Sequence, residues 1–281
     1  MIETILRILI FGAVVGGIWA LVSSGFSLIF GVSRILNFAH GTFFVLSAYI
    51  AIILPFNPVL SSIFGVITAG FMGVLVYLLI RRIREHEIMV VIVTLALALL
   101  FEQILLLNFG EYGMSLQPFL SGYFDIYGVK VTKIRILSLL VALLVLISLE
   151  VFISKTKMGK IIFAVSEDSE AAMLLGINVD FVYAVVMFLS GILAGIAGIF
   201  YAQIFAVSPQ ESLRALIYAF AIVILGGLGS LRGSIISSFI IGYVIVVTIT
   251  FLGARWSEFV MLLIIIAVLV IKPTGLFGVE E

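Results

Sequence analysis

Few side chains in this sequence have the types and spacing that catalysis or metal binding requires. The 281 residues contain no cysteine and two histidines, His40 and His86, which lie far apart in the chain. Thiolate metal sites and cysteine catalysis are therefore excluded, and a histidine metal cluster is not expected. The glycine-rich stretch 226–234 lacks the Gly-Lys-Ser/Thr of a Walker phosphate loop. The sequence predicts a protein that is not an enzyme, binds no metal and carries no cofactor of its own.

One group of polar residues lies between two apolar runs. Arg34, Asn37 and His40 follow at three-residue intervals, and Gly41 comes directly after. If this segment is a loop at the membrane interface, its polarity needs no special function. If it is a break in a helix within a bundle, its side chains and freed backbone groups would line a polar pathway. We favour the second interpretation and assign Asn37, His40 and Gly41 to a substrate pathway.

A second polar point, Glu102-Gln103, interrupts the apolar run 88–107. An acid inside a membrane span costs a few kcal/mol and usually faces the bundle interior or water. Glu102 therefore faces the pathway, pairs with a base such as Arg135, or reaches the interface. We include both Glu102 and Gln103 in the candidate pathway.

The loop 159–180 contains a third candidate site. Ser166 can cap a helix, and the three acids in the next four residues suit the positive end of a helix dipole. Gly176 is placed to end that helix in the left-handed conformation. We expect a short helix over 167–175 that exposes Met173, Leu174 and Leu175. It either rests on the membrane surface or docks a soluble partner.

The composition determines which elements must position these residues. Apolar residues make up 64% of the chain and charged residues 11%, against about 25% charged in a soluble domain. One soluble core of this size cannot bury so much apolar surface, and the net charge of zero offers no attraction for nucleic acid. We expect an all-α, polytopic membrane protein that forms a single transmembrane domain over 1–281.

Nine apolar runs are candidate membrane helices, and most have the ~20 residues needed to cross the bilayer. The run 38–54 is marginal and the run 258–271 is short, so we expect about eight or nine spans. The runs cover residues 5–30, 38–54, 59–80, 88–107, 134–153, 181–205, 213–228, 234–252 and 258–271.

Clustered bases suggest the orientation of the chain. The loops 81–84 and 155–160 are cytoplasmic by the positive-inside rule, and the two spans between them go out and back. Counting forward places the C-terminus in the cytoplasm. Counting backward places the N-terminus outside if 5–30 and 38–54 both cross; if one is re-entrant, the N-terminus is cytoplasmic.

The longest external loop, 108–133, is either an ordered cap or a long turn-rich connection. Lys130, Lys133 and Arg135 at its end run against the positive-inside rule.

Small residues recur every four positions in several spans, as in Gly65, Ala69 and Gly73, and again in Gly191 and Gly195. Such stripes let helix backbones approach closely in lipid. They indicate either tight packing within one bundle or an interface between subunits.

The loop sequence resembles a known transport motif. Glu170-Ala171-Ala172-x-x-x-Gly176 is similar to the start of the "EAA" loop of ABC importer permeases, whose coupling helix sits in a cleft of the ATPase subunit. The distal part of that motif, Ile-x-Leu-Pro, is missing here. The resemblance implies that the cytoplasmic loop 159–180 couples to an ATPase through Glu170, Ala171, Ala172, Leu174, Leu175 and Gly176.

Three further segments resemble the permeases of branched-chain amino acid importers. They are the stretch 24–41 with its Asn-Phe-Ala-His-Gly, the turn 225–230 with Gly233, and the tail 272–278. The matches keep their order over nearly the whole chain. The resemblance implies that Gly226, Gly227, Gly229 and Gly233 form a structural turn.

This resemblance implies a multi-pass permease of the prokaryotic plasma (inner) membrane that translocates branched-chain or other neutral amino acids by alternating access. Its expected partners are a second homologous permease, two ATP-binding cassette ATPases that use ATP and Mg, and an extracytoplasmic substrate-binding protein. Related permeases handle urea or short amides, which is the first alternative.

Two other classes fit the sequence less well. An ion-coupled secondary transporter needs acids near mid-membrane and often an inverted repeat, and Glu102 is the one credible acid. An intramembrane enzyme needs paired catalytic residues in its spans, and no such motif is present.

Overall fold

The computed structural model describes residues 2–277, and it confirms the predicted all-helical membrane fold. Besides the helices, residues 2–277 contain a two-stranded hairpin, an isolated β-bridge between Met114 and Val207, and the connecting loops. The elements are α1 (Ile2–Ser33), α2 (His40–Ile53), α3 (Pro58–Ile80), α4 (Glu87–Phe109), β1 (Tyr123–Ile126), β2 (Val129–Thr132), α5 (Lys133–Lys155), α6 (Lys157–Glu167), α7 (Ser169–Leu174), α8 (Val179–Ile204), α9 (Glu211–Gly226), α10 (Leu231–Phe251), a 3-10 turn η1 (Ala254–Trp256) and α11 (Ser257–Ile271).

Seven helical segments of the described chain are long and apolar enough to cross a membrane: α1, α3, α4, α5, α8, α10 and Ala254–Ile271. Two of the runs expected to be spans form shorter helices, α2 with 14 residues and α9 with 16. At 1.5 Å per residue these two helices are about 21–24 Å long, somewhat less than the ~30 Å hydrocarbon core.

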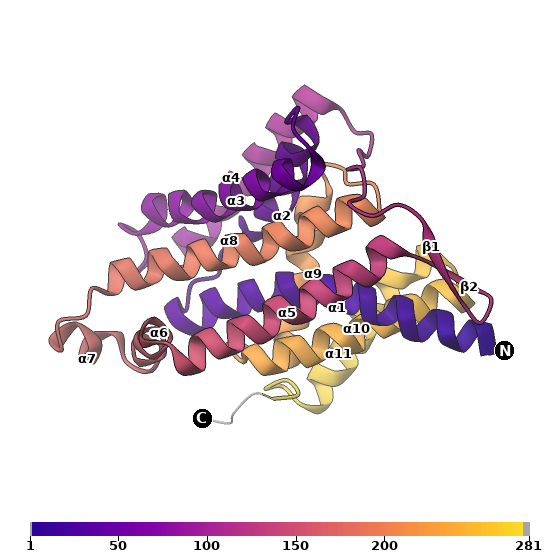
Figure 1. Ribbon diagram of the computed structural model, residues 1–281. Helices are drawn as coiled ribbons and strands as arrows, with labels where there is room; N and C mark the ends of the chain where they lie inside the picture. Colours follow the sequence, from indigo (N-terminus) through magenta and orange to yellow (C-terminus); the bar gives the residue numbers. More distant parts are fainter. Residues whose placement is uncertain (1, 278–281) are drawn as a thin grey trace.

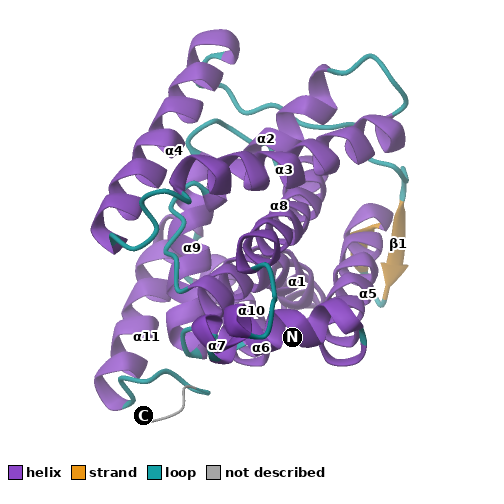
Figure 2. Cartoon of the chain, turned by 90° about the vertical axis from the view of Figure 1, so that its left-hand side faces the viewer, coloured by secondary structure: helices purple, strands orange, loops and turns teal. Residues whose placement is uncertain are grey.

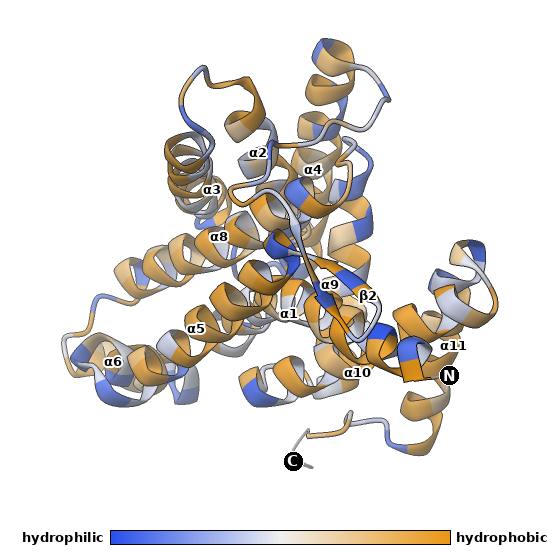
Figure 3. Cartoon of the chain, turned by 45° about the vertical axis from the view of Figure 1, so that its right-hand side comes forward, coloured by the Kyte–Doolittle hydropathy of each residue, from blue (hydrophilic) through white to orange (hydrophobic). Residues whose placement is uncertain are grey.

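The helices run between two ends of the molecule (Figure 1). The α7 end carries α6, α7 and the basic loop 81–86, whereas the hairpin end carries the N-terminus and the β1–β2 hairpin. Hydrophilic residues gather at these ends and apolar residues along the helices between them, as Figure 3 shows. This distribution is the one that a lipid bilayer around the middle of the bundle requires.

The hairpin turns through two left-handed residues, Tyr127 and Gly128, as a tight two-residue turn requires. The Asp125 side chain accepts a 2.9 Å hydrogen bond from the Gly128 amide. The predicted external loop is thus an ordered cap in this part.

Helix α8 lies between two groups of helices, with α2, α3 and α4 on one side and α1, α5 and α10 on the other (Figures 1 and 2). Its glycines bring backbones into contact: a Cβ at Gly191 would collide with the Ala69 carbonyl of α3, and one at Gly198 with the Phe44 carbonyl of α2. Gly73 of α3 meets the Met187 carbonyl of α8 in the same way. These small-residue stripes therefore pack helices within this chain.

Candidate functional site

The predicted coupling loop forms two short helices, α6 and α7, and the chain breaks sharply at Asp168 between them. The sequence analysis expected a helix over 167–175 with Ser166 as its cap, and this boundary is wrong. Ser166 instead donates to the Phe163 carbonyl inside α6. Asp168 caps α7, because its carboxylate accepts 2.9 Å hydrogen bonds from the amides of Glu170 and Ala171. Asp168 is the cap because it lies at the break, next to the free amides at the start of α7.

Helix α7 ends as predicted at Gly176, which has φ +83°. The Gly176 amide donates to the Met173 carbonyl and the Ile177 amide to the Ala172 carbonyl. This left-handed closure turns the chain from α7 into α8.

The helix presents an apolar knob at the extreme α7 end of the molecule (Figure 1). The side chains of Leu174 and Leu175 are 89% and 82% exposed, while Ala172 is buried against the rest of the fold. Glu170 and Ala171 lie on the exposed side of the same helix. Two nearly bare leucines next to each other are what a hydrophobic cleft on a partner protein would bind.

A polar contact fastens the beginning of α8 directly after this knob. The Asp180 carboxylate accepts from Arg84 at 2.5 Å and from the Tyr77 hydroxyl at 2.7 Å. Arg84 also lies over the Tyr183 ring, 5.5 Å from its centroid. These contacts join α8 to the end of α3 and to the loop 81–86. The sequence gives no indication of this link, because its partners are about a hundred residues apart.

The charge of Arg84 is maintained by this contact. Partial burial alone would lower the pKa of the Arg84 guanidinium, but the Asp180 carboxylate and the Tyr77 oxygen outweigh it and raise the pKa. The position of Asp180 near the start of α8 suggests that it caps this helix, but the cap is Asn178, whose side chain accepts from the Phe181 amide at 3.0 Å.

The connection between α1 and α2 is a non-helical segment buried inside the bundle. Arg34 ends α1 in a left-handed conformation, φ 56°, and the chain then runs back alongside α1 before α2 begins at His40. Asn37 is completely buried and accepts a hydrogen bond from the Ala39 amide. The Phe38 amide donates to the Thr94 hydroxyl of α4. The polar residues are thus within the bundle rather than in a surface loop.

His40 lies fully buried at the meeting point of three helices. Its Nε2 is 2.9 Å from the Val22 carbonyl of α1, and its Nδ1 is 3.1 Å from the Ser190 hydroxyl of α8. Gly41 is in contact with the backbone of α9, where a Cβ would collide with the Ser212 carbonyl. Because both ring nitrogens have partners and Gly41 has no free space, these contacts favour a positioning role for the two residues.

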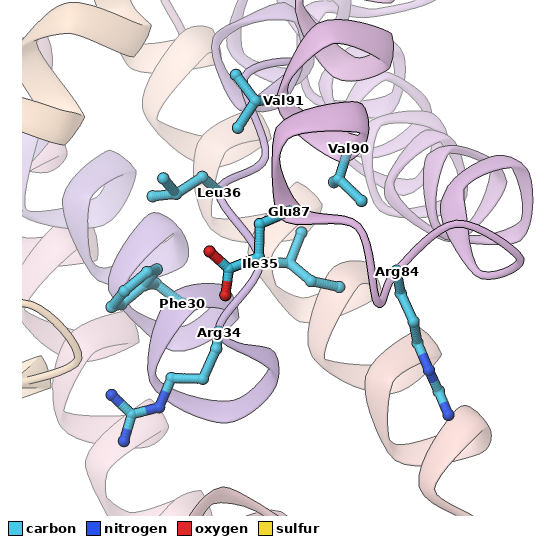
Figure 4. A pocket seen from close by; sticks show the side chains of 8 residues that line it. All are labelled: Phe30, Arg34, Ile35, Leu36, Arg84, Glu87, Val90 and Val91. Carbon is cyan, nitrogen blue, oxygen red and sulfur yellow. The ribbon is translucent and has the colours of Figure 1, made fainter.

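A cleft of about 310 Å³ lies beside this break at the α7 end (Figure 4). Figure 4 shows Glu87 directed toward the connection, whereas the guanidinium groups of Arg34 and Arg84 point away from it. Ile35 and Val90 supply its apolar wall. The cleft therefore combines an acid and two bases without an ion pair across it among the described residues.

The residues Glu102 and Gln103 face different surroundings. Glu102 accepts a 3.0 Å hydrogen bond from the Ser212 hydroxyl of α9 and is partly buried. Gln103 lies exposed on the outer face of α4. Arg135 stacks on the Phe11 ring instead of pairing with Glu102. Of the two residues, Glu102 is the one that the structure directs toward another helix of the bundle.

The glycine turn brings three of the sequence segments together. Gly226 and Gly233 touch backbone to backbone, and Gly227 and Gly229 have φ values of +100° and +81°. The Phe277 amide donates to the Gly226 carbonyl, so the tail is fastened onto the turn. The last residue of the tail segment, Gly278, lies outside the described residues.

Gly229 also packs against Gly31 near the end of α1. Gly227 and Gly229 have positive φ, and Gly226 and Gly233 meet backbone to backbone, so side chains would be unfavourable at these positions. A structural role for the four glycines stays a prediction.

The described residues define a polytopic helical membrane protein with a short exposed helix between two spans. The family model described as branched-chain amino acid transport system / permease component matches residues 8–269. The chain belongs to this family.

Full-length relatives carry the same description. The chain is 25% identical to the high-affinity branched-chain amino acid transport system permease protein LivH of Escherichia coli (strain K12), over 96% of this chain and 94% of that protein. It is 26% identical to the corresponding protein BraD of Pseudomonas aeruginosa, covering 98% of this chain and 96% of that protein.

A solved structure supports the fold. A chain of PsaBC from Streptococcus pneumoniae in complex with Fab superimposes with a TM-score of 0.52 over 96% of this chain and 92% of that chain. Its sequence identity of 13% makes this a likeness of fold.

Proposed function

We propose that this chain is the membrane subunit of an ATP-driven importer that moves branched-chain or other neutral amino acids across the prokaryotic plasma membrane by alternating access. The observation that carries the proposal is the exposed knob Leu174–Leu175 at the α7 end of a chain that belongs to this permease family. Two ATPase subunits bind there and use ATP and Mg. A second, homologous permease completes the pathway, and an extracytoplasmic binding protein delivers the substrate at the hairpin end.

The proposed orientation places the α7 end in the cytoplasm. Three arginines in the loop 81–86 and three lysines in the stretch 155–160 lie at that end. The tail from Lys272 is fastened to the glycine turn, also at that end, which supports a cytoplasmic C-terminus. The hairpin end, with the N-terminus, then faces outward.

Motion of the ATPases would reach the spans through a short path. A displacement of α7 acts on α8 across Gly176, and the Asp180–Arg84 contact passes it to the end of α3. Because α2, α3 and α8 touch backbone to backbone at Gly191, Gly73 and Gly198, the three helices move as one body. The pathway then opens to alternate sides as this body tilts against the remaining helices.

The test compares a knob variant with a matched control. Leu174→Ser removes an exposed leucine from α7, and Leu120→Ser makes the same change at a 47% exposed leucine in the external loop. In proteoliposomes that contain the assembled permeases, ATPases and binding protein, we expect Leu174→Ser to reduce ATP-driven leucine uptake about tenfold, as for an anchor worth ~1.4 kcal/mol. Leu120→Ser should leave uptake unchanged.

Three results would refute the proposal. Uptake driven by an ion gradient without ATP would indicate a secondary transporter. Normal uptake with Leu174→Ser would mean that α7 is not the coupling element. Transport of urea or short amides but of no amino acid would select the alternative substrate class.

A further inference from the structure

Two arginines line a cavity of about 440 Å³ at the hairpin end. Arg7 of α1 and Arg135 of α5 line it together with apolar side chains of α1 and α10. Among residues 2–277, no carboxylate forms an ion pair with either guanidinium. The described residues that line the cavity include no acid, and the single hydroxyl among them, that of Thr250, donates to a carbonyl of its own helix.

An aromatic contact orients one of the two arginines. The Arg135 guanidinium lies 4.4 Å from the centroid of the Phe11 ring, which orients it across the cavity wall instead of toward water. The carboxylate of Glu3, one turn before Arg7, lies beside Gly128 of the hairpin and forms no ion pair with Arg7 in the part of the chain that the structure describes. The cavity therefore offers guanidinium donors above an apolar wall.

The position of the cavity indicates what occupies it. Arg7, Arg135 and Thr250 each lie within a few residues of the hairpin end of their helices, and Phe205 directly follows α8. Helix ends of a spanning bundle lie at the level of the lipid headgroups. A ligand that has an anionic group and an apolar chain can bind the arginines with the first and the apolar wall with the second.

We propose that this cavity binds one anionic phospholipid, whose phosphate contacts Arg7 and Arg135 and whose acyl chain lies against Phe11, Val246 and Ile249. The lack of an acid in the walls argues against a zwitterionic amino acid, whose ammonium group would have no partner. Bound lipid would also explain why bases remain at the end of the protein where the positive-inside rule disfavours them.

The test measures lipid binding by the purified permease assembly in nanodiscs. Phosphatidylglycerol added to phosphatidylcholine discs should raise the apparent melting temperature and remain bound in native mass spectra. Each arginine near an anionic headgroup contributes about fivefold in affinity, so Arg7→Gln should weaken binding about fivefold and Arg7→Gln with Arg135→Gln about thirtyfold. Arg255→Gln changes an exposed arginine at the same end, outside the cavity, and should have no effect.

The results separate lipid from other occupants. The proposal is overturned if phosphatidylcholine alone gives the same stabilisation, if the double variant binds phosphatidylglycerol like the wild type, or if leucine added without lipid reproduces the shift and competes at the arginines. If the double variant does not assemble, Arg7→Gln alone decides: Arg7 is exposed and the substitution leaves the bundle core intact. An unchanged affinity in that variant also overturns the proposal.

Discussion

Replacing His40 with alanine should destabilise the bundle and abolish transport together. The imidazole is fully buried and joins three helices, with Nε2 2.9 Å from the Val22 carbonyl and Nδ1 3.1 Å from the Ser190 hydroxyl. The rings of Phe26 and Phe43 lie edge-on to it at 5.7 and 5.8 Å. Its loss therefore leaves a cavity between aromatic rings and two polar groups without their partner.

The magnitude follows from these contacts. The cavity costs about 2–4 kcal/mol, and each polar group left without its partner adds about 1 kcal/mol. The total is about 4–6 kcal/mol, which should lower the apparent melting temperature by roughly 10–20 °C. A residue that only lined an open pathway would cost far less stability when it is truncated.

The assay measures thermal unfolding in detergent and uptake in proteoliposomes on the same preparations. Ser190→Ala, which removes one partner of the ring, should cost about 1 kcal/mol. The double variant should be more stable than the sum of the two single losses predicts, because both remove the same hydrogen bond. A His40→Ala protein with unchanged melting temperature but abolished transport would refute this reasoning and make His40 a pathway ligand.

Three further predictions follow from the site. Asp180→Asn should change the free energy of unfolding by less than about 1 kcal/mol, since the ion pair is partly exposed. It should nevertheless lower the amount of substrate moved per ATP hydrolysed, and Arg84→Gln should lower this ratio too. If the ratio is unchanged in both variants, the contact does not transmit motion. Glu102→Gln keeps an oxygen that accepts from the Ser212 hydroxyl, so the subunits should still assemble. Uptake should fall severalfold because the charge in the pathway is lost. Normal uptake would show that Glu102 is not part of the pathway. Gly198→Leu forces a side chain into the backbone of α2 and should prevent assembly, which size-exclusion chromatography detects; a normal profile would contradict the close helix packing.

The helical elements could be predicted from the sequence because the apolar runs are long and clear signals bound several of them. Asn57-Pro58 begins α3, with the Asn57 side chain accepting from the Val59 amide, and Gly176 and Gly227 end helices in positive φ. The signals near Ser166 were ambiguous, because serine and aspartate are both good caps and lie two residues apart. Local contacts with α6 decide between them.

The partners of charged residues could not be predicted, because they depend on which helices become neighbours. The bases nearest to Glu150 in sequence are Lys155 and Lys157, yet its carboxylate pairs with Arg232, 82 residues away, at 2.6 Å. Likewise, Glu102 and Gln103 are adjacent, but one residue of helical rotation turns Glu102 toward α9 and leaves Gln103 exposed. The sequence alone does not fix which face of a uniformly apolar helix meets its neighbours.

The segments that carry the family resemblance have one physical property in common, close contact between backbones. Gly41 touches α9, Gly226 touches Gly233, and Gly229 touches Gly31. These segments therefore specify how the helices meet and turn, and they need no side chain that recognises a substrate. A family can keep this framework and still transport different solutes, provided that selectivity resides elsewhere. It follows that variants of these glycines should fail to assemble and should lose transport of every substrate alike. A change at Glu102, in contrast, can alter the rate of transport of one substrate relative to another.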